Sequence, residues 1–473
     1  MASPFSSSTT ARGGAFGRRR VRATAKFLLI TLGCAKNEVD TDRMRALLLR
    51  AGFEETQDPY DADVAIVNTC SFLAAATEES VEVTLELAEL VSSGIRACPI
   101  IMCGCVPSRY GEELVPELPE VTAFVRAEDE DSIVSVVCDV LGIGHGFMAG
   151  ADASKQGVLR TVEATSAFVK ISEGCDRFCT FCAIPNIRGR YYSRPADEIV
   201  AEVEALMQGG VREIVLIGQD TGVWGHDLNG SPTLASLLVR VAEAVRPYEG
   251  WVRVLYLQPE GMTDELIATM RDVPEVLPYI DIPIQHCSER VLRSMGRKGS
   301  PDELRALFAR LRSEIPGMVL RTTAMAGFPG ETDEEADELL AFLQEEEFDY
   351  CSVFEYSPEE GTKAAEMPNQ IDESTKLERT QRLQDMAEEL GFSATASHVG
   401  ERVKVIVDGV EENGEGGVEL IGHTWFQAPD SDGAVHIDTG DVAVGDIVTC
   451  DLVDSFCYEL VGRIVDEGKE SVA

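Results

Sequence analysis

The stretch that decides the fold is residues 172–191, SEGCDRFCTFCAIPNIRGRY. It contains three cysteines in a Cys-x3-Cys-x2-Cys spacing: Cys175, Cys179 and Cys182. Three thiols this close cannot all form disulfides, because their number is odd and the closed loops would be very small. The residues around them are mostly polar, which argues against the alternative of three buried, hydrophobe-like cysteines. The spacing therefore predicts a loop that holds a shared metal centre.

Three cysteine ligands leave one iron of a four-iron cluster without a protein ligand, and an open coordination position is where a metal site does chemistry. With Phe181 just before the last cysteine, the spacing resembles the signature of the radical S-adenosylmethionine enzymes. In that superfamily the open iron binds S-adenosylmethionine, and reductive cleavage yields a 5'-deoxyadenosyl radical. The resemblance implies a 4Fe-4S cluster, S-adenosylmethionine and a reductant such as flavodoxin or ferredoxin.

The composition is strongly acidic, with 82 Asp and Glu against 41 Lys and Arg and a formal net charge of −41. Repulsion from phosphates opposes nucleic-acid binding unless a basic patch is segregated, so a basic protein partner is favoured. Thirteen cysteines, an odd number with metal-like spacings, favour a reducing compartment. No apolar run reaches the roughly 18 residues that span a bilayer. We predict a cytoplasmic monomer with no membrane partner.

The first 26 residues contain no acid and are rich in Ser, Thr, Gly and Arg. This composition predicts a disordered basic tail at 1–26, with an organellar transit peptide as the less favoured alternative.

The next segment alternates short apolar runs with longer helical stretches. Predicted strands lie at 27–32, 64–67 and 99–102, and predicted helices at 38–51 and 77–92. The alternation predicts a parallel α/β domain at residues 27–145.

A cysteine follows each of these predicted strands: Cys34, Cys70 and Cys105. The carboxyl ends of parallel strands line a common crevice, so the three could form a second thiolate site. The alternative stays open, because a single cysteine at a strand end is usually structural and Cys103 competes with Cys105.

A second alternating series follows a predicted linker at 146–165. Its predicted strands lie at 167–171, 213–217, 252–257, 279–283, 319–324 and 350–356. Six β/α units predict a partial barrel of the TIM type at residues 166–396, with chemistry on the loops that follow the strands. The Cys175 stretch follows the first of them.

Two further post-strand loops, at Gly218-Gln219 and at Gly327, are predicted with Phe181 to contact the cofactor. A glycine loop that opens a helix can bind an anion or a ribose. The alternative for each loop is a turn followed by a helix cap. His286 is interpreted as a lining residue or a cap, and no side chain is predicted to be catalytic.

The last segment, 397–467, has short strands separated by Gly and Asp turns, which predicts a five-stranded barrel of the OB type. Such barrels often bind nucleic acid. Residues 401–470, however, contain seventeen acids against four bases, which indicates a cationic protein surface as the partner.

Motifs along nearly the whole chain resemble the methylthiotransferase branch of the radical S-adenosylmethionine superfamily, which has an N-terminal methylthiotransferase domain, a radical domain and a C-terminal TRAM domain. They are LGCAKNEVDTD at Leu32, GQDT at Gly218, YIDIPIQH at Tyr279, RTTAMAGFPGET at Arg321 and YSPEEGTKA at Tyr356. Within the branch they are most similar to the enzymes that modify an aspartate of ribosomal protein S-twelve. The transfer-RNA adenosine enzymes tend to carry a GCQMN-like first motif and a GQNV-like loop.

The resemblance implies two 4Fe-4S clusters, a radical cluster on the Cys175 stretch and an auxiliary one on Cys34, Cys70 and Cys105 rather than Cys103. It implies hydrogen abstraction from the aspartate β-carbon, a sulfur donor and a methyl group from a second S-adenosylmethionine. The chain departs from the usual DAPEIDG-like TRAM motif at Gln427 and Asp430. A transfer-RNA methylthiotransferase and a non-enzymatic iron-sulfur sensor or electron carrier are the alternatives.

Overall fold

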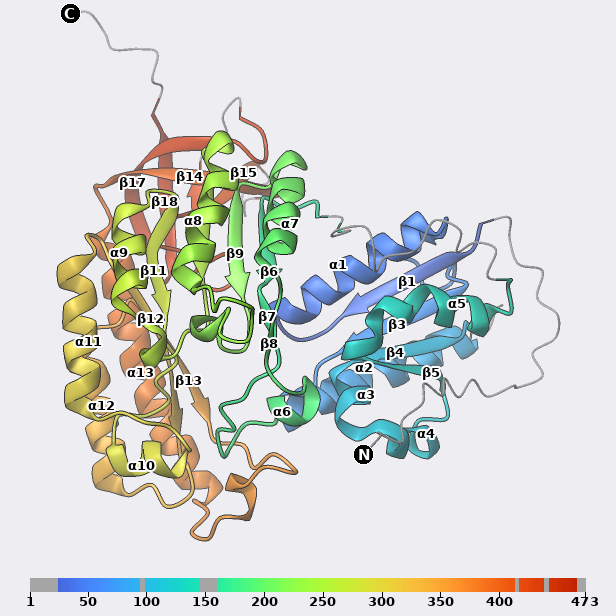
Figure 1. Ribbon diagram of the computed structural model, residues 1–473, viewed down its shortest axis with the longest axis horizontal. Helices are drawn as coiled ribbons and strands as arrows, with labels where there is room; N and C mark the ends of the chain where they lie inside the picture. Colours follow the sequence, from blue (N-terminus) through green and yellow to red (C-terminus); the bar gives the residue numbers. More distant parts are fainter. Residues whose placement is uncertain are drawn as a thin grey trace, which may run out of the picture.

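The computed structural model describes residues 24–93, 98–144, 160, 162–412, 417–437 and 442–465. Nearly all of the predicted tail at 1–26 and most of the predicted linker at 146–165 lie outside the described residues. Figure 1 shows the N-terminal α/β part beside a central barrel, with the C-terminal strands at one end of that barrel.

The N-terminal part is a five-stranded parallel sheet in the order β2-β1-β3-β4-β5. Its strands are β1 (Lys26–Thr31), β2 (Glu54–Glu55), β3 (Val64–Thr69), β4 (Ile100–Gly104) and β5 (Val121–Arg126). Its helices are α1 (Ala35–Arg50), α2 (Ala74–Ser93), α3 (Cys105–Tyr110), α4 (Leu114–Glu117) and α5 (Ile133–Leu141).

Alternate residues of β3 enter two apolar clusters, one on each face of this sheet. Val64 and Ile66 pack in the cluster that contains α1 and α5, whereas Ala65 and Val67 pack in the cluster that contains part of α2. Both faces are therefore covered, which explains why the central strands are continuous apolar runs. Strand β5 is not predicted by the sequence analysis. It is an edge strand whose residues alternate between buried and half-buried positions, a weaker signal than a continuous run.

The central part is a six-stranded parallel sheet in the order β13-β12-β11-β10-β9-β6, and it confirms the predicted partial barrel. Its strands are β6 (Ser166–Lys170), β9 (Glu213–Ile217), β10 (Trp251–Val254), β11 (Val276–Asp281), β12 (Val319–Ala326) and β13 (Tyr350–Glu355). Strand β10 ends earlier than predicted, because Tyr256 takes up a positive φ of 62° and its N–H bonds to the Asp281 carboxylate at 3.1 Å.

Helices pack on the outer side of this sheet (Figure 1) and enclose a large apolar cluster with it. They are α7 (Ala196–Gln208), α8 (Leu234–Val245), α9 (Asp264–Asp272), α11 (Pro301–Glu314) and α12 (Asp333–Glu346), with the shorter α10 (Glu289–Ser294) after β11. In α8, for example, Leu237, Leu238 and Val241 are fully buried on one face.

The C-terminal part is a closed five-stranded barrel in the order β14-β15-β16-β18-β17, as predicted. The strands are β14 (Arg402–Glu412), β15 (Val418–Thr424), β16 (Val435–Ile437), β17 (Ile447–Phe456) and β18 (Glu459–Ile464), and they follow the long helix α13 (Glu373–Ser397). Its core is continuous with apolar residues of β9 to β12, including Ile217 and Tyr279. Gln427, where the chain departs from the usual TRAM motif, lies between the C-terminal barrel and the central sheet. It is fully buried, and its carbonyl accepts from Arg253 at 2.8 Å.

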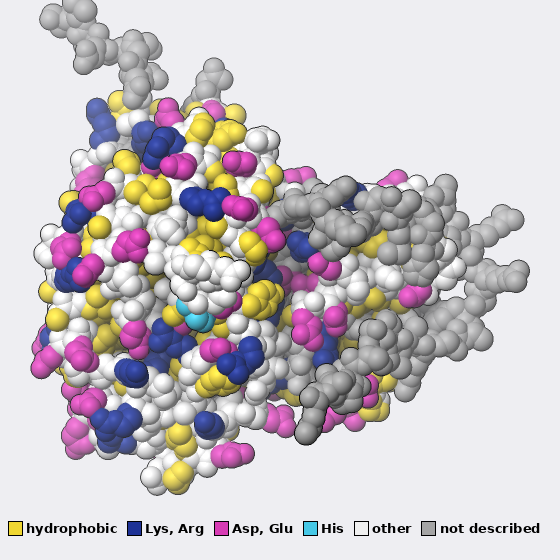
Figure 2. Space-filling view, in the orientation of Figure 1, with side chains coloured by type: hydrophobic (Ala, Val, Ile, Leu, Met, Phe, Trp, Pro, Cys, Tyr) yellow, Lys and Arg dark blue, Asp and Glu magenta, His cyan; other side chains and the backbone are white. Residues whose placement is uncertain are grey.

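On the face shown in Figure 2, Lys and Arg side chains stand among Asp and Glu side chains. The described residues in that view therefore form no broad basic surface. Within the described ranges, no helix is long and apolar enough to cross a membrane.

Candidate functional site

The Cys175 loop, defined as residues 174–191, follows β6 and is closed at its base by a short antiparallel pair, β7 (Ser172–Glu173) and β8 (Tyr192–Ser193). Thr180 anchors its middle, since its N–H donates to Met295 O at 2.9 Å and its carbonyl accepts from Ala364 N at 2.8 Å. The loop is therefore held from the loops that follow β11 and β13.

The three thiols of the Cys175 loop are close to one another. Burial raises the pKa of Cys182 to about 12, and Cys179 and Cys175 lie near enough to add to that shift. Burial also raises the pKa of Cys175. Neutral thiols that lose protons only with difficulty gain a strong driving force for ionisation when they bind iron.

Gly218 and Gln219 lie at the end of β9, next to the base of the Cys175 loop. An added Cβ at Gly218 would lie 2.4 Å from Ser172 Oγ, so a larger residue there would have to displace the Ser172 side chain or the backbone. Gln219 donates from Nε2 to Glu173 Oε1 at 2.8 Å. Its Oε1 is buried with no partner among the described residues, and so is Oδ1 of Asp220. Two unsatisfied acceptors beside the loop fit a polar ligand with donor groups.

The other two predicted cofactor contacts are Phe181, within the loop, and Gly327, which follows β12. Phe181 packs against an apolar cluster that contains Phe328 and Tyr356, and the Arg297 guanidinium lies 5.8 Å from its ring centre. Gly327 has a φ of +75° and packs against Lys376, so that an added Cβ would lie 2.3 Å from Lys376 Cγ.

The helix that follows Gly327 is capped by its own side chains. Thr332 and Glu335 form a capping box at the start of α12. This geometry favours the helix-cap alternative for that loop over an anion site. His286 is fully buried: its Nδ1 accepts from Ser288 N, just before α10, at 2.9 Å, and its Nε2 lies 3.4 Å from Glu331 Oε1.

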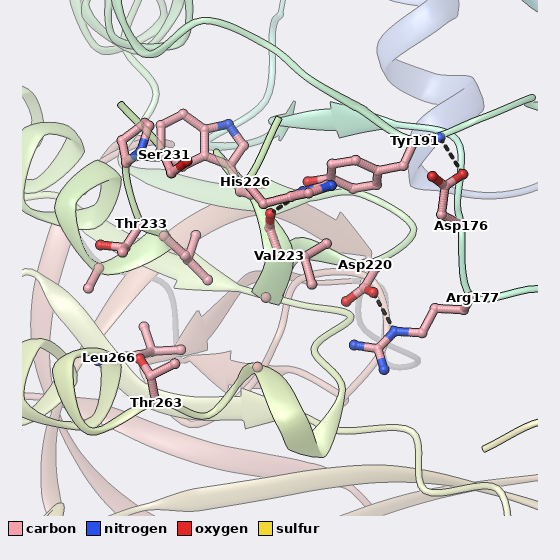
Figure 3. A pocket seen from close by; sticks show the side chains of 16 residues that line it. Asp176, Arg177, Tyr191, Asp220, Val223, His226, Ser231, Thr233, Thr263 and Leu266 are labelled. Atoms are coloured by element: carbon pink, nitrogen blue, oxygen red, sulfur yellow. Dashed lines mark hydrogen bonds and ion pairs between the residues drawn. The ribbon is translucent and has the colours of Figure 1, made fainter. Parts of the chain in front are cut away.

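A cavity of about 560 Å³ opens beside the Cys175 loop (Figure 3). Arg177 and Asp220 lie in its wall and form an ion pair, with 2.6 Å between Arg177 Nε and Asp220 Oδ2. Burial raises the pKa of Asp220, and Arg177 opposes that effect. Tyr191 and His226 pack in the same wall with their ring centres 5.0 Å apart. The cavity thus combines aromatic walls with one buried carboxylate.

The strand-end cysteines, defined as Cys34, Cys70 and Cys105, are brought together by the order of the N-terminal sheet. They follow β1, β3 and β4, which are neighbouring parallel strands. Gly33 packs so tightly against Cys70 that an added Cβ would lie 2.5 Å from Cys70 Cβ. Burial raises the pKa of Cys105 to about 11, with Cys70 and Cys34 near enough to contribute. Cys103, in contrast, is fully buried inside β4 among apolar residues.

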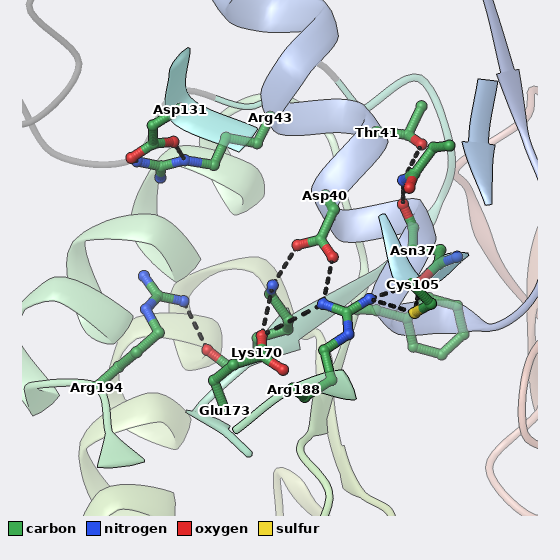
Figure 4. A network of polar contacts seen from close by, with 12 residues as sticks. Asn37, Asp40, Thr41, Arg43, Cys105, Asp131, Lys170, Glu173, Arg188 and Arg194 are labelled. Atoms are coloured by element: carbon green, nitrogen blue, oxygen red, sulfur yellow. Dashed lines mark hydrogen bonds and ion pairs between the residues drawn. The ribbon is translucent and has the colours of Figure 1, made fainter. Parts of the chain in front are cut away.

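A buried polar network joins the strand-end cysteines to the Cys175 loop (Figure 4). Arg188, from the loop, donates to Asp40 Oδ2 at 2.7 Å, to Asn37 Oδ1 at 2.6 Å and to Cys105 Sγ at 3.5 Å. Asp40 also accepts from Lys170, which donates to Glu173 Oε2 at 2.8 Å. These residues were not predicted from the sequence. The only sequence signal for them was the presence of charged residues in stretches that are buried in the folded protein.

The donor chemistry fits two iron-sulfur sites, each with three thiols from one part of the chain. In the described part of the chain, no three His, Cys, Asp or Glu side chains already stand around the position of a single metal ion. The thiolates of a four-iron cluster lie farther apart than the ligands of a single ion. Three cysteines that share one neighbourhood therefore fit a cluster even where they do not surround a single point.

Three family models match the chain in the same order as its three parts. They are described as "Uncharacterized protein family UPF0004" at residues 26–126, "Radical SAM superfamily" at 169–343 and "TRAM domain" at 399–465. A protein of Trichlorobacter lovleyi called "Ribosomal protein uS12 methylthiotransferase RimO" is 42% identical, over 94% of this chain and 99% of its own. The protein of the same name from Geobacter sulfurreducens is 41% identical with the same coverage.

The chain belongs to the ribosomal protein uS12 methylthiotransferase family. It is thereby a transferase of the radical S-adenosylmethionine superfamily, which implies one 4Fe-4S cluster and S-adenosylmethionine as cofactors. Among solved structures, a radical S-adenosylmethionine methyltransferase, TsrM, from Kitasatospora setae is similar with a TM-score of 0.51 and 15% identity. The match covers 70% of this chain and 73% of that one. At this identity the likeness concerns the fold alone.

Proposed function

We propose that this protein attaches a methylthio group to the β-carbon of an aspartate in ribosomal protein uS12. The name shared by its relatives supports the substrate. The observation that carries the proposal is the contact between Arg188 of the Cys175 loop and Cys105 of the strand-end cysteines, 3.5 Å apart. With this contact, the thiols of the Cys175 loop and the strand-end cysteines lie on the two sides of one interface, although they are far apart in the sequence.

In this proposal Cys175, Cys179 and Cys182 hold a radical 4Fe-4S cluster, and Cys34, Cys70 and Cys105 hold an auxiliary one. When bound, the clusters and S-adenosylmethionine supply the radical that removes hydrogen from an unactivated C–H bond, and the sulfur and methyl group that replace it.

The residues of the chain bind, orient and exclude water. Gly218 lets the backbone at the end of β9 pack closely against Ser172 at the base of the Cys175 loop, and the free Oε1 of Gln219 can accept from an amino or hydroxyl group. Phe181 remains a proposed cofactor contact, whereas the capping box that follows Gly327 favours a structural role for that glycine. Arg188 and the buried ion pair of Arg109 with Glu359, at 3.0 Å, hold the N-terminal sheet against the barrel. Buried contacts of this kind supply the positioning that a radical transfer needs.

The domain limits that we propose are 27–145 for the methylthiotransferase domain, 166–396 for the radical domain and 397–467 for the TRAM domain. The net charge of −41 favours a cationic ribosomal protein as substrate over a nucleic acid. A one-electron reductant, such as flavodoxin or ferredoxin, and a sulfur donor complete the reaction, and we propose that a cytoplasmic monomer carries it out.

The proposal is tested by intact-mass analysis of small-subunit ribosomal proteins from strains with and without the gene. We expect uS12 from the strain with the gene to be heavier by one SCH2 unit, and fragmentation to place the addition on one aspartate. Equal masses would reject the substrate. Transfer RNA from the same strains provides the control, because a change in its methylthioadenosine would favour the transfer-RNA alternative instead.

A further inference from the structure

Arg188 is the side chain of the Cys175 loop that donates a hydrogen bond to a sulfur of the strand-end cysteines, and Ala183 and Ile187 of the same loop pack in a buried cluster with Cys105. Arg188 is 3% exposed, so water cannot replace its contacts. One terminal nitrogen bonds to Asp40 Oδ2 at 2.7 Å. The other reaches Asn37 Oδ1 at 2.6 Å and Cys105 Sγ at 3.5 Å. Because both terminal nitrogens of the planar guanidinium are hydrogen-bonded, its N–H groups have a fixed direction, and one of them points at Cys105 Sγ.

Asn37, which accepts from Arg188, is itself held in place by two backbone carbonyls. Its Nδ2 donates to Leu32 O at 2.7 Å and to Thr69 O at 2.9 Å, the carbonyls at the ends of β1 and β3. The loops that carry Cys34 and Cys70 are therefore fastened to the side chain that orients Arg188. The three strand-end cysteines and Arg188 form one connected unit.

The surrounding charges keep Arg188 cationic. Arg188 pairs with Asp40 at 2.7 Å and lies 3.7 Å from Glu173 Oε2. Asp40 is shared with Lys170, and Lys170 is paired in turn with Glu173. These two carboxylates and two cations, with the buried Glu130 nearby, form one cluster of charges beside Cys105.

We propose that Arg188 is a positioning residue for the auxiliary cluster. It donates a hydrogen bond to the Cys105 thiolate and thereby raises the reduction potential of that cluster. It also holds the cluster in place against the Cys175 loop. A hydrogen bond from a cation to a ligand sulfur stabilises the more negative, reduced form of a cluster. The inference rests on the proposed function in one respect, because it requires the auxiliary cluster.

The test uses the full chain with Cys175→Ala, Cys179→Ala and Cys182→Ala, so that only the auxiliary cluster remains. Arg188→Met, Arg188→Lys and Arg160→Met are added to it separately. Arg160 is the matched control: it is 4% exposed and joins Asp42 to Glu202 across the same interface, at 2.9 and 3.1 Å, without touching a cysteine. The midpoint potential is measured by electron paramagnetic resonance during a redox titration.

We expect a lower midpoint potential in Arg188→Met, a potential between the two in Arg188→Lys, and an unchanged potential in Arg160→Met. Both methionine variants should melt at lower temperature, so a merely structural role predicts the same potential in both. An equal potential in Arg188→Met and Arg160→Met would overturn the inference while leaving the auxiliary cluster in place. If Arg188→Met does not retain its cluster, the comparison rests on Arg188→Lys against Arg160→Met.

Failure of the triple-cysteine variant to bind any cluster would overturn the auxiliary site and the inference together. A second readout uses the enzyme with all six cysteines. Arg188→Met should release more 5'-deoxyadenosine per methylthio group transferred, because the radical forms but the auxiliary cluster is displaced. An unchanged ratio would contradict the positioning role.

Discussion

The guanidinium of Arg109 lies 3.0 Å from the carboxylate of Glu359, and the two side chains are only 6% and 2% exposed. Arg109 follows Cys105 in α3, and Glu359 belongs to the loop after β13. Glu359 also accepts from Ala74 N at 2.9 Å, and Arg109 donates to Ser71 O at 2.8 Å. This pair therefore fastens the segment after Cys70 and helix α3, which begins at Cys105, to the barrel.

Glu359→Gln should destabilise the protein by about 3 kcal/mol or more, because it leaves the buried Arg109 without its counter-charge. A thermal melt measures the effect. The matched control is Glu345→Gln, which removes an exposed ion pair with Arg305 of 2.8 Å and should cost less than about 1 kcal/mol. Similar losses in both variants would contradict a special role for the Arg109–Glu359 pair.

Cys175→Ala should remove about half of the bound iron and abolish cleavage of S-adenosylmethionine, since one of two clusters loses a ligand. Iron analysis and assay of 5'-deoxyadenosine check this. Cys457→Ser is the control, because Cys457 is an exposed free cysteine in the C-terminal barrel and should leave both quantities unchanged. Full iron content in Cys175→Ala would refute the ligand assignment.

Gly218→Ala should weaken the binding of S-adenosylmethionine without loss of iron, because its Cβ would stand 2.4 Å from Ser172 Oγ and displace the loop. Removing that oxygen in the double variant Gly218→Ala with Ser172→Ala should restore part of the affinity. Gly409→Ala meets no atom within 4 Å and is the neutral control. Equilibrium binding measures all three, and undiminished affinity in Gly218→Ala would exclude this contact.

His423 should make the docking of the C-terminal barrel sensitive to alkali. It lies between Glu213 Oε2 at 2.7 Å and Asp408 Oδ2 at 2.6 Å. Burial by itself would lower the pKa of His423, but these two carboxylates outweigh burial and raise it from 6.5 to about 9. Because the folded pKa is raised, the stabilisation is complete below the unfolded pKa and is lost as the pH rises through about 9.

The melting temperature should therefore fall between about pH 7 and about pH 9.5, by an amount that corresponds to at most on the order of 3 kcal/mol. His423→Gln should be less stable at neutral pH and should lack this part of the pH dependence. A variant whose melting curve follows the same pH profile as the original protein would show that another group titrates.

Local features of the chain were predictable from the sequence, because the residues that determine each of them lie within a few positions of one another. The spacing of Cys175, Cys179 and Cys182 predicts a metal loop wherever it occurs, and the continuous apolar runs of β3 and β9 predict buried strands. The end of β10 was not predictable, because it depends on a bond between Tyr256 and Asp281 that only the folded sheet creates. Strand β5 was missed because an edge strand needs only one buried face.

The sequence by itself determined the order of strands and helices, the Cys175 loop and the acidic character of the surface, since these follow from residue type, period and short spacing. Only the tertiary structure decided that the strand-end cysteines meet, because this requires β1, β3 and β4 to be neighbours in one sheet. It also decided that Arg188 reaches Cys105, Asn37 and Asp40. A contact between residues this far apart is set by the packing of two domains, and no local pattern in the chain records it.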